Sequence, residues 1–249
     1  MAGQLANINT VYQTVLALAN KEQRGYITPQ EFNLFAKQAQ MEIFEQYFYD
    51  LDQFTRGIRG SESDFAPDMQ TSLEQRMSKF LVSQELNQVD NGVFSMPTDL
   101  YKISTVFVVK KDSNYSCVVD IVNSDEAIKM INGGYLTRPT NNRPICYTKS
   151  NIDLSSNRIF IFPFDTNYVT NAVMSFFKAP KDPNWTYIVV NEKPIYTPML
   201  STQSFQLEKS EERNLILKIL QLAGVAIQDF SLAQAAAQAD NNVSMQQKR

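Results

Sequence analysis

Apolar residues recur every three or four positions near the start of the chain, and this spacing predicts a first helix over residues 7–20. A second helix is expected from Pro29 to about Asp50, because Thr28 and Glu31 form a capping box ahead of it. The apolar residues of this helix exceed one stripe, so more than one of its faces should be covered. The inner stripe comprises Phe32, Phe35, Ala36, Ala39, Ile43, Tyr47 and Leu51, and Leu34, Met41, Phe44 and Phe48 fall largely outside it.

Residues 55–68 are rich in Gly, Ser, Asp and Pro, which indicates an exposed loop. A third helix is expected to start at Asp68 or Thr71. Its inward-facing residues would be Leu73, Met77, Phe80 and Leu81.

From about Leu86 the pattern changes to short β-branched runs separated by polar turns, which is typical of strands. A short helix near 124–132, capped by Asn123 or Ser124, should end at Gly133-Gly134 in the left-handed conformation. Helix returns at Ser210, with an apolar stripe that extends to Phe230. Strands are expected at 93–97, 103–110, 115–122, 144–148, 158–162, 171–178 and 185–190, and 195–197 is a further candidate.

This order of elements predicts the α+β class, as a helical bundle with an inserted antiparallel β module. Residues 1–85 would form the N-terminal part of the bundle, and 86–205 the inserted module. Residues 206–235 would complete the bundle with a long C-terminal helix. Residues 236–249, rich in Ala, Gln and Asn, are expected to be a flexible tail.

Composition narrows the function classes. The formal charge of −3 argues against a protein that coats nucleic acid. Histidine is absent, which removes the commonest general base and metal ligand. Cys117 and Cys146 could form one bridge, although two reduced core thiols are the favoured reading. No signal peptide and no membrane span is expected, so we predict a soluble protein made in the cytosol.

The search for catalytic chemistry is negative. Without histidine the common triads cannot be built, and no Walker loop is present. Asp50 and Asp52 resemble the start of a calcium loop, but the following positions lack the required ligands. The acidic pairs Asp125-Glu126 and Glu211-Glu212 fit the first turns of helices, where the macrodipole favours negative charge. We therefore expect no enzyme activity, no cofactor and no metal.

Two surfaces are candidates for contacts. The segment Arg56–Gly60 contains Arg56, Arg59 and a GXXG-like pattern in which two glycines flank Ile58-Arg59. It is either a flexible connection with solvated arginines or a contact to DNA or an acidic partner. The outer aromatics of the second helix, Phe44, Phe48 and Tyr49, are candidates for a subunit interface, since interfaces are enriched in Tyr and Phe.

A family resemblance adds to these patterns. Residues 11–48, VYQTVLALANKEQRGYITPQEFNLFAKQAQMEIFEQYF, are similar to a region of virion proteins of crAss-like bacteriophages. The three-helix start, the turn MPTDLYKI before a β run and the long final helix resemble the head-to-tail adaptor (tail tubular, or ring) proteins of short-tailed phages.

The resemblance implies a non-enzymatic subunit of a ring, usually of twelve copies, under the portal. The helical bundles would form the ring wall, and the β module would face outward or toward the tail. A C-terminal segment would reach the portal, which carries over here to residues 230–249 and so to Phe230, Met245, Lys248 and Arg249.

The expected function is thus a phage connector that joins portal to tail and lets DNA pass through its lumen. Its partners would be its own copies, the portal and other tail ring or tube proteins, with only weak contact to genomic DNA. It would be made in the bacterial cytoplasm and reside in the virion. The alternative is a nucleic-acid-binding module that uses the Arg56–Gly60 loop. The sequence leaves open the subunit number, the ring's position in the stack and the face that meets the portal.

Overall fold

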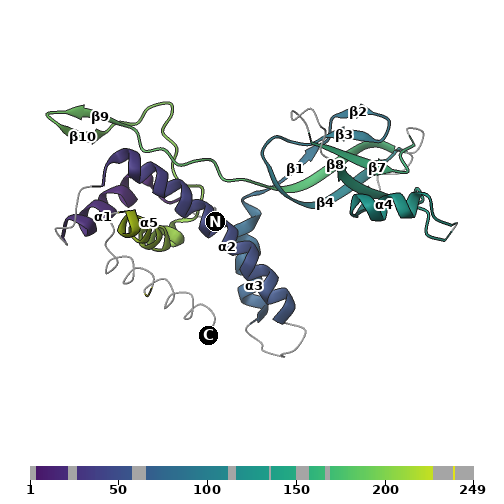
Figure 1. Ribbon diagram of the computed structural model, residues 1–249, viewed down its shortest axis with the longest axis horizontal. Coiled ribbons are helices and arrows are strands. Elements are labelled where there is room, and N and C mark those ends of the chain that lie inside the picture. The colour runs from purple at the N-terminus through teal and green to yellow at the C-terminus, as the bar shows by residue number, and fades with distance from the viewer. Residues whose placement is uncertain are drawn as a thin grey trace. The chain divides into compact units, whose positions relative to one another are not determined.

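The computed structural model describes residues 4–21, 27–57, 66–111, 116–134, 136–149, 157–165 and 169–226, together with Gln238. The chain divides into two compact units, which are described separately below. Met1–Met77 and Pro180–Arg249 make up the first unit, and Ser78–Ala179 the second. The fold is α+β, with N-terminal helices, an inserted β sheet and a helix after it (Figure 1).

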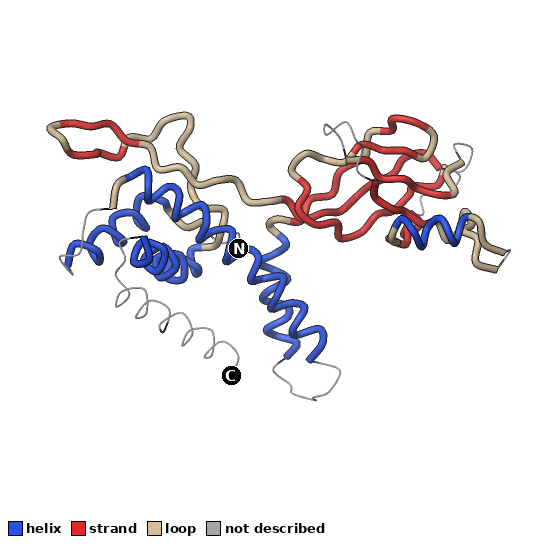
Figure 2. Tube along the Cα trace, in the orientation of Figure 1, coloured by secondary structure: helices blue, strands red, loops and turns tan. Residues whose placement is uncertain are grey.

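The described residues of the first unit form four helices and a small hairpin. The helices are α1 (Ile8–Lys21), α2 (Pro29–Gly57), α3 (Ala66–Ser78, whose last residue belongs to the second unit) and α5 (Glu212–Ala226). The single turn η1 (Lys209–Glu211) leads into α5, which packs against both α1 and α2. Strands β9 (Tyr187–Val190) and β10 (Lys193–Tyr196) form a separate two-stranded sheet (Figure 2).

Local sequence explains where α1 and α2 begin. The Asn7 side chain accepts the backbone N–H of Asn9 at 2.8 Å, as an N-cap should. At α2 the Thr28 hydroxyl accepts the Glu31 N–H at 3.3 Å, and the Glu31 carboxylate accepts the Thr28 N–H at 2.9 Å. This reciprocal pair is the predicted capping box, and it is confirmed.

The core of the first unit lies between α1, α2 and α5. Most of the predicted inner stripe of α2 is buried in this core, but Phe35 and Leu51 are only half-buried, and Phe44, expected outside the stripe, is fully buried. Among the side chains of these three helices that the structure describes, the buried apolar ones are Ile8, Val11, Tyr12, Val15, Ala19, Phe32, Ala36, Ala39, Ile43, Phe44, Tyr47, Leu215, Ile219, Leu220 and Ala223.

The second unit is one eight-stranded sheet in the order β1-β8-β4-β5-β6-β7-β3-β2. Only two residues separate β1 from β2, although these strands lie at opposite ends of that order. Leu86 N–H donates to Ala172 of β8, and Asn87 accepts from Ser95 of β3, so this link curls the sheet around its core. The strands are β1 (Leu81–Glu85), β2 (Gln88–Asp90), β3 (Val93–Ser95), β4 (Leu100–Lys110), β5 (Ser116–Ile121), β6 (Ile145–Lys149), β7 (Arg158–Phe162) and β8 (Val169–Lys178).

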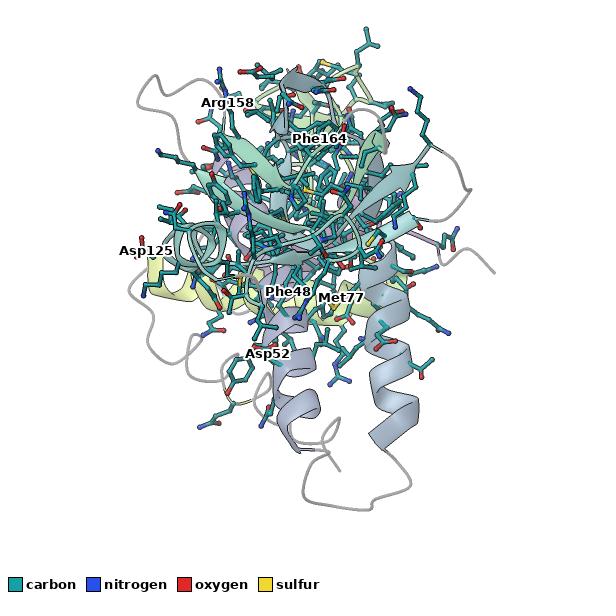
Figure 3. The ribbon with its side chains drawn as sticks, turned by 90° about the vertical axis from the view of Figure 1, so that its right-hand side faces the viewer. Phe48, Asp52, Met77, Asp125, Arg158 and Phe164 are labelled. Carbon is teal, nitrogen blue, oxygen red and sulfur yellow. The ribbon has the colours of Figure 1, made fainter. Side chains whose placement is uncertain are left out.

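The inner face of the curled sheet forms a separate core. Phe94 packs edge-on against Phe164, with ring centroids 5.2 Å apart. Figure 3 labels Phe164 within this unit. The buried residues of this core are Leu86, Phe94, Val106, Val108, Val119, Cys146, Ile159, Ile161, Ala172, Met174 and Phe176.

The module is not wholly antiparallel, because β5 and β6 pair in parallel. The predicted short helix, α4 (Ser124–Ile131), provides the crossover that a parallel pair needs. Its N-cap is Asn123, without a side-chain capping bond. Gly133 does not adopt the expected left-handed conformation: a Cβ there would lie 2.4 Å from Thr137 Oγ1, so glycine serves close packing instead.

Several predicted boundaries differ from the structure. Helix α2 continues past Asp50 to Gly57, and α3 begins at Ala66, so both helices extend into the stretch expected to be a loop. Leu81 is not an inward-facing helical residue but the exposed first residue of β1. The two strands near 185–197 belong to the first unit rather than to the inserted sheet.

Candidate interaction surface

Among the described elements of the first unit, the β9–β10 hairpin carries the largest group of exposed apolar side chains, and we call it the arm. Ile188, Val189, Val190 and Ile195 expose between 43% and 65% of their surface. A two-stranded hairpin is marginally stable alone in water. Exposed apolar residues gathered on such an element are typical of a protein–protein contact.

The turn of the arm fixes its register. Val190 pairs with Lys193, which leaves Asn191 and Glu192 as a two-residue turn. Both have positive φ, 50° and 62°, as a type I′ turn requires. Asn tolerates this conformation, whereas Glu carries a steric cost. The sequence signal was therefore weaker than an Asn-Gly turn would have given.

Trp185 anchors the base of the arm to the helices. Its ring stacks on Tyr187 and Tyr196, with centroids 5.5 and 5.9 Å away, and lies 3.9 Å from the Tyr12 ring of α1. The indole N–H also donates to Asn9 Oδ1 at 3.1 Å. One face of the arm is thus held against the body of its own unit.

Buried and half-buried amides on α2 tie down the ends of the segment that carries the arm. Asn33 accepts the Trp185 N–H at 2.8 Å and donates to the Trp185 carbonyl. Gln40 is buried, donates to the Lys181 carbonyl at 2.8 Å and accepts the Gln206 N–H at 2.9 Å. Residues 182–205 therefore leave the helices and return to them at the same side chain, Gln40, and we call this segment the excursion.

An open groove of about 710 Å³ runs between α2 and this excursion. The exposed Leu34 lines it, and the ion pair of Lys37 with Asp182, at 2.7 Å, lies at its side. A groove this open lacks the enclosure typical of a small-molecule site. The groove widens the exposed surface beside the arm.

The predicted interface aromatics of α2 divide into core and surface. Phe44 is fully buried in its own unit and packs edge-on against Phe48 at 5.1 Å, so it belongs to the core and cannot present a surface. Phe48 is half-buried, and Tyr49 exposes 67% of its surface. Figure 3 shows Phe48 on α2, one turn from Asp52. Only Phe48 and Tyr49 stay candidates for a contact.

The remaining predicted contact residues lie either at the end of α2 or outside the described residues. Arg56 and Gly57 are the last helical residues of α2, so the GXXG-like segment does not begin as a loop. Arg59 lies outside the described residues, as do Phe230, Met245, Lys248 and Arg249.

An ion pair between a half-buried arginine and a buried carboxylate, which the sequence did not indicate, joins α3 to η1. Arg76 pairs with the buried carboxylate of Glu211, which also accepts from Asn214 Nδ2 at 2.7 Å. Burial, and then the charge of Glu211, raise the pKa of Tyr47. Glu211 was expected to interact with the dipole at a helix N-terminus, but its buried carboxylate also pairs with Arg76. Its partner Arg76 lies 135 residues away, which no local pattern reveals.

Neither cysteine forms a disulfide. Cys146 is buried in the second core, where burial and the charge of Asp120 raise its pKa to about 12. Cys117 is half-buried, and its thiol donates to the Asn142 carbonyl at 3.2 Å. The expectation of reduced thiols is confirmed, although Cys117 lies at the margin of the core.

Other features give no further site. Within the described ranges, no cluster of three or more Cys, Asp and Glu residues could hold a metal ion. Within those same ranges, none of the helices has the length and apolar character needed to cross a bilayer.

Comparison with known proteins adds no family. A scan against models of known protein families finds no match for this chain, and a search of curated proteins finds none either.

Proposed function

We propose that this chain is a structural virion protein whose copies assemble into a ring, of twelve subunits, at the head-to-tail junction of a bacteriophage. The ring would join the portal to the tail and let DNA pass through its lumen. The protein would act by association and not by catalysis. It would be made in the bacterial cytoplasm and reside in the virion.

The exposed apolar arm is the observation that carries this proposal. An obligate subunit keeps apolar surface that a neighbouring copy covers, whereas monomers seldom expose such patches on a projecting element. The arm is held at its base by Trp185 and Gln40 inside its own unit. A preformed arm loses little conformational entropy on docking.

The resemblance of residues 11–48 to virion proteins of crAss-like phages supports a virion ring as the assembly. The net charge of −3 suits a lumen that DNA must leave, because basic side chains are what hold phosphates non-specifically. Portal and other tail ring proteins are the remaining proposed partners.

Native mass spectrometry of the purified chain, alone and with the portal protein of the same phage, tests the proposal. We expect a closed ring, or a ring that forms on the portal. Replacing Ile188 and Ile195 together by Thr keeps β-branched side chains but removes apolar area, and should dissociate the ring. Leu136→Thr, at a residue exposed on the second unit, is the matched control and should assemble normally. A wild-type chain that stays monomeric and ignores the portal would refute the proposal.

A further inference from the structure

A row of side chains crosses the outer face of the second unit. Strand register aligns Glu85 of β1 with Val173 of β8, Val173 with Phe107 of β4, and Phe107 with Val118 of β5. The adjacent positions Met174, Val106 and Val119 face the core, so this row faces outward. Val118 exposes 62% of its surface, and Phe107 and Val173 are half-buried. We call Glu85, Val173, Phe107 and Val118 the outer row.

Polar positions border the outer row on one side. Ser83, Ser175 and Thr105 align beside it, and the two serine hydroxyls share a hydrogen bond of 2.8 Å. On the other side, Asn171, Val109 and Ser116 align. The outer row is therefore a narrow apolar band across three strands, with one carboxylate at its end.

The free face of the arm carries a similar set of side chains. Ile188 pairs with Ile195, and Val190 pairs with Lys193, so these four residues share one face. The opposite face carries Tyr187 and Tyr196, which lie on Trp185. The free face thus presents three apolar side chains and one cation.

The two surfaces match in kind and in charge. Each offers three apolar side chains, and Lys193 on the arm complements Glu85 on the outer row. Within the part of the chain that the structure describes, neither Lys193 nor Glu85 takes part in an ion pair. The arm is two strands wide, about 5 Å between strands, and the apolar part of the outer row spans three strands.

Resting on the proposed ring, we infer that the arm of one copy docks across the outer row of the next, with Lys193 beside Glu85. The two surfaces differ and belong to different units of the chain. A contact between unlike surfaces is head-to-tail, and it closes into a ring when the rotation between copies allows. A symmetric dimer would instead require each surface to meet its own copy.

Charge reversal tests this pairing. Lys193→Glu and Glu85→Lys each place like charges together, and each should weaken assembly about tenfold at low salt. Mixing the two variants in equal amounts should restore assembly, because each arm then meets an opposite charge on the other variant. In such a mixed ring the two variants alternate. The ring therefore closes without a contact between like charges only if the number of subunits is even, as it is for twelve. The double variant should assemble alone.

Sedimentation velocity in 50 mM and 500 mM salt gives the readout, with circular dichroism to verify folding. The controls are Lys129→Glu and Glu126→Lys on α4, which packs against β6 and contains no residue of the outer row. They carry the same charge changes and should not alter assembly. If wild type forms rings but mixing rescues nothing, the pairing is wrong and another surface, or the portal, covers the arm. If the double variant assembles but the mixture does not, the contact lies within one chain and the inference fails. If wild type never assembles, the proposed function itself fails.

Discussion

Gln40→Leu tests whether one buried amide holds the excursion that carries the arm. The side chain is 1% exposed and bonds to the backbone of Lys181 and Gln206, at 2.8 and 2.9 Å. Leucine is close to glutamine in size, so the substitution leaves little cavity. It removes a donor and an acceptor while both backbone partners stay in place.

The magnitude follows from those two bonds. Each contributes about 1 kcal/mol net, and an orphaned buried partner costs about 1–3 kcal/mol. The Lys181 side chain is exposed and Gln206 is half-buried, so water reaches part of the freed backbone. We expect a total loss of about 2–3 kcal/mol in the free energy of unfolding, which lowers Tm by roughly 5–10 °C.

Calorimetry and hydrogen exchange together check the reasoning. The melting transition should fall, and the amides of residues 182–205 should exchange faster than those of α1. The matched control is Gln38→Leu, at an exposed position whose side chain donates to Glu42 at 3.0 Å, and it should change stability by less than about 0.5 kcal/mol. A Gln40→Leu protein as stable as wild type, with unchanged hydrogen exchange in the excursion, would refute the claim that Gln40 holds the excursion in place.

Substitutions at three further positions probe charges and backbone. Arg76→Met leaves the buried Glu211 without its cation and should cost about 3 kcal/mol in chemical denaturation, whereas Arg76→Lys should cost less. Glu192→Gly relieves a positive φ and should raise stability in thermal melts by about 0.5–1 kcal/mol, and an unchanged Tm would show that the turn carries no strain. Hydrogen bonds from the backbone and hydroxyl of Thr28 lower the pKa of Glu31, so its stabilising effect is present above the unfolded pKa and is lost as pH falls through the lowered one. Urea midpoints measured from pH 6 to pH 2.5 should therefore converge with those of Glu31→Gln at the acid end.

Local signals predicted the fold class and most elements. The capping box at Thr28 and Glu31 is formed by neighbours in sequence, so its residues alone specify it. The β-branched runs predicted β4, β5, β7 and β8 because a pleated, half-buried sheet favours such residues. The end of α2 was misplaced because exposed polar residues such as Asp52 continue a helix as readily as they end one.

Features that depend on distant partners were not predictable. Gln40 is one polar position on a helix, and its role becomes visible only when the backbone of Lys181 and Gln206 is placed beside it. β1 was missed because all its residues are exposed and no alternation marks it. The arm was read as part of the inserted sheet, since a β-branched run does not reveal which sheet it joins.

The two proposed contact surfaces, the arm and the outer row, lie in different compact units of the chain. The inserted unit begins and ends at paired backbone, because Lys178 N–H donates to the Phe80 carbonyl at 2.9 Å. Its core shares no residue with the core around α2. A substitution in the outer row of one unit should therefore leave the arm of the other intact. The loss of assembly after a charge change at Glu85 or Lys193 then reports on the contact itself, since neither residue supports the core of its unit.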